Sequence, residues 1–196
     1  MADPLPLRLI LASGSPARRE LLDRAGYRFE VMPADIEEPS GAGIQDIRAF
    51  VQSVAWLKAA AVAPRVSDGV VLAADTVGWV DGQVLGKPAD EADARRILKL
   101  LGDREHELWT GVVLWRRPDD VQLAWQERSR VFFRSLSDAE LDVYLATRQW
   151  RENSGAYAIQ EPVDPYVRVV EGSVSNVVGL PLETLIPLLR WFTATR

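Results

Sequence analysis

The sequence contains no cysteine and only one histidine, His106, among 196 residues. The lack of cysteine excludes disulfide bonds and thiolate metal sites, and a single histidine excludes a multi-histidine metal cluster. No apolar stretch is long enough to cross a bilayer, and residues 1–8 carry two prolines and an aspartate where a secretory signal would have a basic end and an apolar run. We therefore expect a cytoplasmic protein that does not bind membranes.

The chain also has fewer positive than negative side chains. It contains 23 lysines and arginines and 28 aspartates and glutamates, which gives a net charge of -5. A nucleic-acid polymer is therefore not an expected partner, since phosphate-backbone binding needs a concentrated basic stripe. A small anion in a local basic pocket stays possible. The remaining composition, 47% hydrophobic and 26% charged, is that of an ordinary globular protein, and its length suits a single domain over residues 1–196.

The pattern of apolar runs and turn residues predicts an α/β fold with a mixed, twisted sheet flanked by helices. Strands are expected at 7–12, 29–32, 105–115, 121–133 and 166–170, and a fully apolar one at 70–74 that ends on Asp75. Residues 76–85 are interrupted by Asp81 and Gly82 and should form two antiparallel strands. Helices are expected at 15–26, 44–63, 90–101, 137–147 and 182–192.

The first candidate site is the loop of residues 13–19, which joins a buried strand to a helix. Amide groups at a helix start, the glycine between Ser13 and Ser15, and the two arginines Arg18 and Arg19 together suit phosphate oxygens. The alternative is that the serines only cap a helix whose arginines are solvated. On local sequence the two interpretations are about equally supported.

The second candidate is Asp75, because a carboxylate on the most apolar strand of the chain is costly to desolvate. Ligands of α/β sheets also gather near the carboxyl ends of strands. A turn aspartate is the alternative. Glu37 and Glu38 could add oxygen ligands for Mg²⁺, which usually uses one or two carboxylates plus substrate phosphates, although solvated loop residues are the commoner case.

Two lysines form a third candidate group. Lys58 lies on the apolar stripe of its helix, so its ammonium must either extend to water, the commoner outcome, or meet a buried anion. Lys87 precedes Pro88, which favours extended backbone and could direct the lysine into a cleft, with an ordinary exposed loop lysine as the alternative.

The fourth candidate is the segment 154–160, which holds small residues, Tyr157 and Gln160. A stacking ring and an amide are what a nucleobase pocket needs, but a tightly packed turn is at least as consistent with the sequence. His106 receives no catalytic role, because nothing near it in sequence could serve as its nucleophile.

In their order along the chain, these segments resemble the Maf family of nucleotide pyrophosphatases, sometimes described as septum-formation inhibitors. The matching segments are residues 9–16 (LILASGSP), 20–22 (ELL), 73–77 (AADTV), 85–90 (LGKPAD), 110–112 (TGV), 155–157 (GAY), 171–173 (EGS) and 176–181 (NVVGLP). The resemblance implies a Maf/ITPase-like fold of two lobes around a central cleft. It also implies a divalent cation, Mg²⁺ or Mn²⁺, and house-cleaning hydrolysis of nucleoside triphosphates to monophosphate and pyrophosphate.

The resemblance further implies roles for individual residues. Asp75 would be the catalytic proton acceptor and, with Glu38, a metal ligand. The phosphates would lie among basic and hydroxyl side chains, namely Ser13, Ser15, Arg18, Lys58 and Lys87.

Substrate preference would depend on three positions. Thr76 and Gln160 resemble the branch of the family that acts on dTTP and UTP, and differ from the branch that acts on 7-methylguanosine triphosphate. Ala17 departs from the first branch, which usually has arginine there. We expect dTTP and UTP as substrates, with Ala17 as the departure.

Two rival functions remain at this stage. A nucleotide-binding regulator of cell division could use the same loop without catalysis, and a phosphatase acting on the terminal phosphate would release orthophosphate instead. A homodimer is a further possibility, with no residue in the sequence that requires it.

Overall fold

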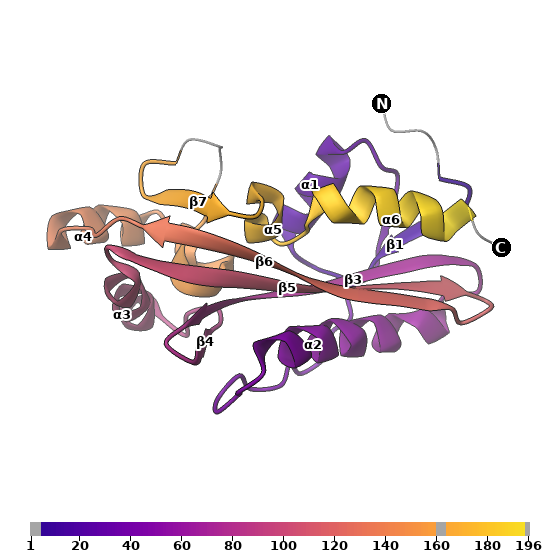
Figure 1. Cartoon of the computed structure of the whole chain (residues 1–196), viewed down its shortest axis with the longest axis horizontal. Coiled ribbons are helices and arrows are strands. Elements are labelled where there is room, and N and C mark those ends of the chain that lie inside the picture. The colour runs from indigo at the N-terminus through magenta and orange to yellow at the C-terminus, as the bar shows by residue number, and fades with distance from the viewer. Residues whose placement is uncertain (1–4, 160–163, 195–196) are drawn as a thin grey trace.

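A mixed β-sheet extends along the whole molecule and carries helices on both faces (Figure 1). The computed structural model describes residues 5–159 and 164–194. The strand order is β2-β1-β3-β5-β6-β7, with β4 paired to β3. β1 runs parallel to β2 and β3, and the other neighbours are antiparallel. The strands are β1 (Leu9–Leu11), β2 (Glu30–Val31), β3 (Gly69–Val80), β4 (Gln83–Leu85), β5 (Arg104–Arg117), β6 (Gln122–Phe133) and β7 (Val167–Glu171).

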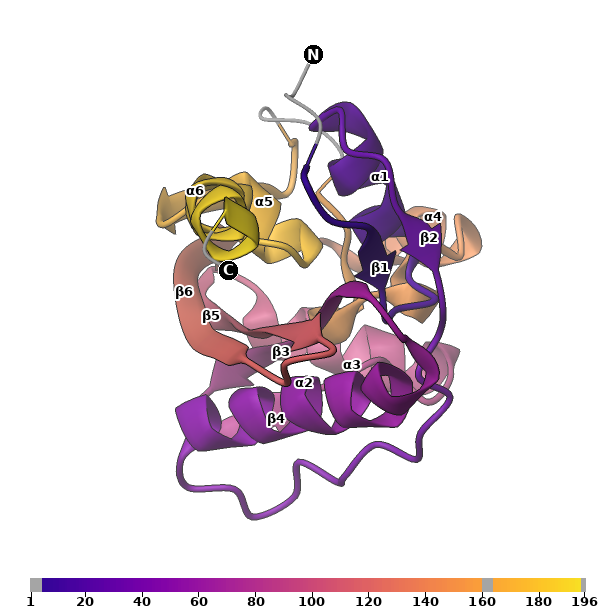
Figure 2. The same ribbon diagram turned by 90° about the vertical axis from the view of Figure 1, so that its right-hand side faces the viewer.

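The helices form layers on the two faces of this sheet. α2 (Ile47–Val62) covers one face, and α1 (Pro16–Arg24) lies with α6 (Leu182–Ala194) over the other (Figure 2). The remaining helices are α3 (Glu91–Leu101), α4 (Asp138–Ala146), α5 (Val174–Val178) and three 3₁₀ turns, Ala63–Arg65, Gln149–Glu152 and Ser154–Ala156. The expected mixed sheet flanked by helices is confirmed.

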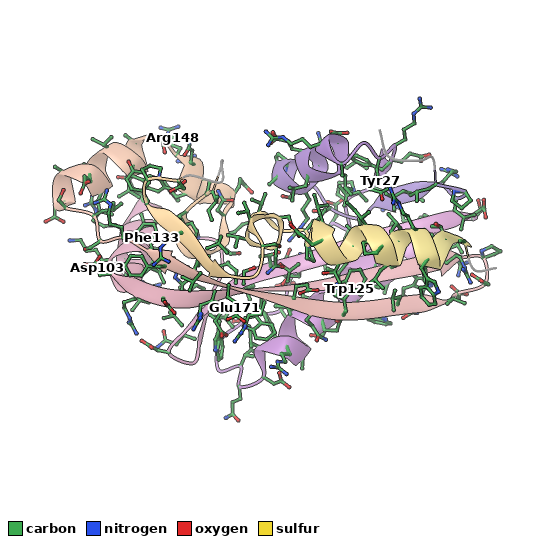
Figure 3. The ribbon with its side chains drawn as sticks, turned by 45° about the horizontal axis from the view of Figure 1, so that its top comes forward. Tyr27, Asp103, Trp125, Phe133, Arg148 and Glu171 are labelled. Carbon is green, nitrogen blue, oxygen red and sulfur yellow. The ribbon has the colours of Figure 1, made fainter. Side chains whose placement is uncertain are left out.

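Separate apolar clusters give the molecule two lobes. In one lobe α1 and α6 pack on the sheet through residues such as Leu22 and Leu185, in a cluster that also includes the buried Tyr27 (Figure 3). In the other lobe α3 and α4 pack through Leu98 and Leu141 on the ends of β5 and β6, around Phe133. The long strands β3, β5 and β6 join the two lobes.

Strand β3 does not end at Asp75, and the expectation that it would is wrong. It continues to Val80, because β5 pairs with it without interruption and places Asp75 opposite Gly111. On its other edge, β1 reaches only as far as Leu72 and β4 begins opposite Gly78. Among the described residues no strand covers that edge between these two points, so Asp75 lies mid-strand beside a gap in the sheet edge.

Gly111 allows α2 to approach the sheet closely at this point. A Cβ atom on Gly111 would lie 2.3 Å from the backbone oxygen of Val51, a residue of α2. Because Val51 and Lys58 lie two turns apart on the same face of α2, this close approach brings Lys58 to the strand next to Gly111. The glycine therefore helps to set the distance between Lys58 and Asp75.

Several helix boundaries follow from capping residues. Ser15 caps α1, with its Oγ accepting from the amide of Arg18, and Ser137 and Glu140 form the expected capping box at α4. The helix expected at 44–63 begins at Ile47, because the side chain of Asp46 caps it. Helix α5 was not expected.

No helix among the described residues has both the length and the apolar character needed to cross a membrane.

Candidate functional site

A cleft of about 1370 Å³ lies between the two lobes, at the gap in the edge of β3. The alternation of side chains along β3 sends Asp75 toward α2 and Thr76 toward α1, so both faces of the strand contribute to the cleft. Most of the candidate site residues line it, namely Ser13, Ser15, Ala17, Arg18, Glu38, Lys58, Asp75, Thr76 and Lys87. Two further candidates, Arg19 and Glu37, are not among the residues that line it. Gln160 lies outside the described residues.

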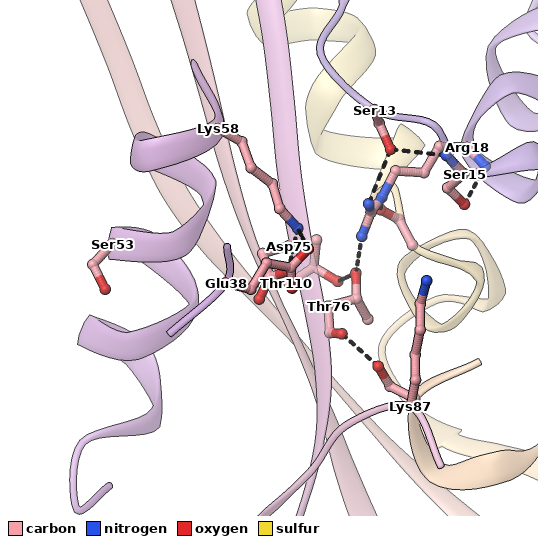
Figure 4. Close-up of polar contacts among 12 residues, drawn as sticks. Ser13, Ser15, Arg18, Glu38, Ser53, Lys58, Asp75, Thr76, Lys87 and Thr110 are labelled. Carbon is pink, nitrogen blue, oxygen red and sulfur yellow. Dashed lines mark hydrogen bonds and ion pairs between the residues drawn. The ribbon is translucent and has the colours of Figure 1, made fainter. Parts of the chain in front are cut away.

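A buried ion pair forms the acidic part of the cleft (Figure 4). Lys58 Nζ donates to Asp75 Oδ1 at 2.7 Å, and these side chains are only 10% and 7% exposed. The same ammonium lies 2.8 Å from Glu38 Oε1, on a side chain that is 56% exposed. Of the two outcomes open for Lys58, the structure has the buried anion rather than extension to bulk water.

Arg18 forms the basic part of the cleft and is held by three hydrogen bonds. Its Nε donates to the carbonyl oxygen of Gly179 at 2.9 Å, Nη1 to Ser13 Oγ at 3.2 Å and Nη2 to Thr76 Oγ1 at 3.0 Å. Burial lowers the pKa of the guanidinium, while the negative charges of Asp75 and Glu38 act to raise it. Three of its five N–H groups are used by these bonds, which leaves two for a ligand.

Hydrogen bonds among hydroxyl and carbonyl groups hold Thr76 in place. Thr76 Oγ1 lies 2.9 Å from Thr110 Oγ1, and Thr110 in turn donates to the carbonyl oxygen of Asn176 at 3.3 Å. Ser154 Oγ donates to the carbonyl oxygen of Thr76 at 2.8 Å. Thr110 and Asn176 were not identified as site residues from the sequence, although they lie in segments that carry the family resemblance, whereas Ser154 begins the fourth candidate segment.

Gly179 is a further residue that sequence reasoning missed. Besides accepting from Arg18, it has a positive φ of 126°, and a Cβ atom there would lie 3.2 Å from Arg18 Nε. A side chain at this position would therefore strain the backbone and crowd the guanidinium. The only signal in the sequence was the glycine within residues 176–181 (NVVGLP). Its partner, Arg18, lies 161 residues away, so the contact could not be predicted locally.

Lys87 lies on the rim of the cleft, apart from the buried pair. Its ammonium contacts Glu152 Oε2 at 2.9 Å, and the two side chains are 60% and 72% exposed. Among the contacts of the described residues, none joins Lys87 to Lys58, Asp75 or Arg18.

Tyr157 forms part of the cleft wall in the lobe of α3 and α4. Its hydroxyl lies 2.6 Å from His106 Nε2, and the two rings meet edge to face. Burial lowers the pKa of His106 to about 4, so the imidazole is neutral at pH 7. His106 is not among the residues that line the cleft, and its ring contacts the Tyr157 hydroxyl from behind the cleft wall.

Two carboxylates of the cleft are candidates for holding a metal ion. Within residues 5–159 and 164–194, no group of three or more histidine, cysteine, aspartate and glutamate side chains is placed to hold an ion. Asp75 and Glu38, however, already converge on one cation, the Lys58 ammonium. Two converging carboxylates fit Mg²⁺ or Mn²⁺ when substrate oxygens complete the coordination.

Fold and cleft together define an α/β protein with a cleft between two lobes that is lined by both acidic and basic side chains. A solved structure of the Staphylococcus aureus Ham1 protein has the same fold, with a TM-score of 0.51 and 16% sequence identity over 95% of this chain and 98% of that chain.

The family follows from sequence comparison. The family model described as Maf-like protein matches residues 8–192, and the chain belongs to this family. A dTTP/UTP pyrophosphatase of Bacillus cereus is 40% identical over 94% of this chain and 95% of its own length. The dTTP/UTP pyrophosphatases of Bacillus anthracis and of Bacillus mycoides are 39% and 40% identical over the same shares.

Proposed function

We propose that this chain is a nucleoside triphosphate pyrophosphatase, which hydrolyses nucleoside triphosphates to the monophosphate and pyrophosphate. The observation that carries the proposal is the buried Lys58–Asp75 pair, which faces a cleft also lined by Arg18. A general base and phosphate-binding cations are thereby present in one cavity, as hydrolysis of a phosphoanhydride requires. Family membership and the activity in the names of the Bacillus relatives support the same function.

In the proposed mechanism, basic groups bind and orient the triphosphate. Arg18 offers two unused N–H groups, Lys58 has an ammonium with three donors, and the rim lysine Lys87 can turn from Glu152 toward the phosphates. Ser13 and Ser15 keep Arg18 and the helix start in place. Nearby positive charge then stabilises the negative charge that grows on the leaving pyrophosphate.

Asp75 is proposed to act as the proton acceptor. A water molecule beside Asp75 gives up its proton to the carboxylate and attacks the α-phosphorus. The bond between the α-phosphorus and the bridging oxygen breaks, and pyrophosphate leaves with the electron pair. Mg²⁺ or Mn²⁺ held by Asp75 and Glu38 would supply charge neutralisation at the phosphates.

The proposed substrates are dTTP and UTP. The names of the Bacillus relatives support this choice, as do Thr76 and Gln160, which resemble that branch of the family. Ala17 lies on the cleft wall where the branch usually has arginine, so recognition in this chain relies on the other two positions.

A panel of nucleoside triphosphates incubated with Mg²⁺ tests this function, with products identified by ³¹P NMR. The proposal expects pyrophosphate and the monophosphate, with dTTP and UTP turned over fastest. Orthophosphate would instead identify a terminal phosphatase, and binding without any product would identify the regulator of cell division. Faster turnover of purine nucleotides would overturn the substrate choice alone.

A further inference from the structure

Lys58 occupies the point at which Asp75 and Glu38 converge. Its Nζ is 2.7 Å from Asp75 Oδ1 and 2.8 Å from Glu38 Oε1, with the ammonium between the two carboxylates (Figure 4). We propose that Lys58 is a resident cation that keeps the metal off these carboxylates until a nucleotide arrives. The inference rests on the proposed function, in which the same carboxylates bind the metal.

The charges around this point support a resident cation. Asp75 and Glu38 carry two negative charges, and Lys58 neutralises one of them at contact distance. Arg18 is close enough for both carboxylates to act on its guanidinium. Two carboxylates and two cations leave the site with no net negative charge, so a divalent ion gains little attraction and meets repulsion from a nearby ammonium.

Burial makes the Lys58 contact with Asp75 hard to displace by a metal ion alone. The two side chains are 10% and 7% exposed, and separating them would leave a buried carboxylate or a buried ammonium without its partner. A metal ion on its own brings no anion to receive the displaced ammonium.

A triphosphate removes this obstacle, because it carries its own negative charge. Phosphate oxygens can accept hydrogen bonds from the ammonium of Lys58 and from the remaining N–H groups of Arg18. Lys58 can then leave the carboxylates of Asp75 and Glu38. Asp75 and Glu38, once released, would be free to hold the metal, which would neutralise charge at the phosphates. Metal and nucleotide therefore bind cooperatively at this site, and each raises the affinity of the other by the same factor.

Mn²⁺ binding to the nucleotide-free protein, measured by electron paramagnetic resonance, tests the inference. The wild-type protein should bind Mn²⁺ with a Kd above about 1 mM. A tighter Kd in the wild-type protein would overturn the inference without the need for any variant.

Two substitutions of Lys58 sharpen the test. Lys58→Gln keeps a hydrogen-bond donor toward Asp75 but removes the charge, and Lys58→Met removes both. In each, loss of a positive charge at contact distance should tighten nucleotide-free Mn²⁺ binding at least about tenfold. Lys87→Met is the matched control, because this lysine contacts only Glu152 in the described contacts and should leave Mn²⁺ affinity unchanged. Equal Mn²⁺ affinity in wild type and a folded Lys58→Gln protein would overturn the inference.

Failure of this inference can be told apart from failure of the proposed function. The Mn²⁺ titration involves neither nucleotide nor turnover, whereas the proposed function depends on pyrophosphate release by the wild-type protein. Turnover without tighter Mn²⁺ binding in the variants would reject only the resident cation. Absence of pyrophosphate release would reject the proposed function.

Discussion

Two lysine–carboxylate pairs on the walls of one cleft show how burial changes the energetic effect of the same kind of ion pair. Lys58–Asp75 and Lys87–Glu152 have nearly equal lengths, 2.7 and 2.9 Å. The first pair is almost fully buried, while both side chains of the second are more than half exposed. Water screens the second pair and can replace either partner, whereas the burial of the first pair leaves little water to replace either of its partners.

This difference assigns the two pairs different tasks. The buried pair holds the Asp75 carboxylate in a fixed position beside the cleft, where it is proposed to act as proton acceptor. The exposed pair can open at small cost, so Lys87 is able to move to an arriving phosphate. Loss of the buried pair should therefore change chemistry and stability, and loss of the exposed pair should change mainly binding.

The largest expected effect comes from the buried carboxylate. Asp75→Asn keeps the size of the side chain but removes the proton acceptor, and should lower kcat by about 10³-fold. Pyrophosphate release, followed by a coupled phosphate assay, measures this change, and circular dichroism confirms the fold. Unchanged turnover in a folded protein would exclude Asp75 as the base and remove the basis of the comparison.

The second effect concerns stability. Lys58→Met leaves Asp75 buried without its partner, and should lower the free energy of unfolding by about 2–4 kcal/mol, somewhat reduced by the access of water from the cleft. Urea denaturation followed by tryptophan fluorescence gives the value. A loss below about 1 kcal/mol would mean that the buried pair is no stronger than the exposed one.

The third effect extends the comparison to a buried pair without charge, His106 and Tyr157. Burial lowers the pKa of His106 to about 4, below its ordinary value of 6.5. As pH falls below 6.5, His106 becomes protonated in the unfolded chain. In the folded protein it stays neutral until about pH 4. The free energy of unfolding therefore decreases as pH falls from 6.5 to 4. Between pH 7 and pH 5 the loss should be roughly 2 kcal/mol.

His106→Gln provides the control for this pH dependence, because it removes the titrating group. Urea denaturation of both proteins at the two pH values isolates the contribution of His106 from that of the carboxylates. An equal loss of stability in wild type and His106→Gln would contradict the assignment.

The smallest effect on stability belongs to the exposed pair. Lys87→Met should lower the free energy of unfolding by less than about 1 kcal/mol, because both partners remain solvated. It should raise KM for the triphosphate while kcat changes little, as expected for a group that binds ground state and transition state alike. A large fall in kcat with unchanged KM would place Lys87 in the chemistry and remove the distinction between the two pairs.

Patterns within short segments predicted most of the fold. Alternation and turn residues located the long β5–β6 hairpin, and Ser137 with Glu140 marked the start of α4. The end of β3 was placed wrongly at Asp75, since a charged residue after an apolar run resembles a strand end. In the molecule the strand continues, because β5 pairs along its whole length. α5 was missed, since five residues contain too little periodicity.

The candidate site was predictable only where one side chain carried the signal. Lys58 and Asp75 are charges in apolar segments, which marked both as candidates, although the sequence left open whether Lys58 extends to water or meets a buried anion. Arg18 contacts the backbone carbonyl oxygen of Gly179, which lies 161 residues away in sequence, and the contact has room because Gly179 has no side chain. Such a contact leaves no local pattern in the sequence, so only the three-dimensional arrangement reveals it.

The position of oxygen incorporation tests the central claim most directly. Hydrolysis of UTP in H₂¹⁸O, followed by mass spectrometry of the products, reports which phosphorus the water attacks. The account predicts ¹⁸O in the monophosphate, since water beside Asp75 attacks the α-phosphorus. Label found in pyrophosphate, or in released orthophosphate, would contradict it.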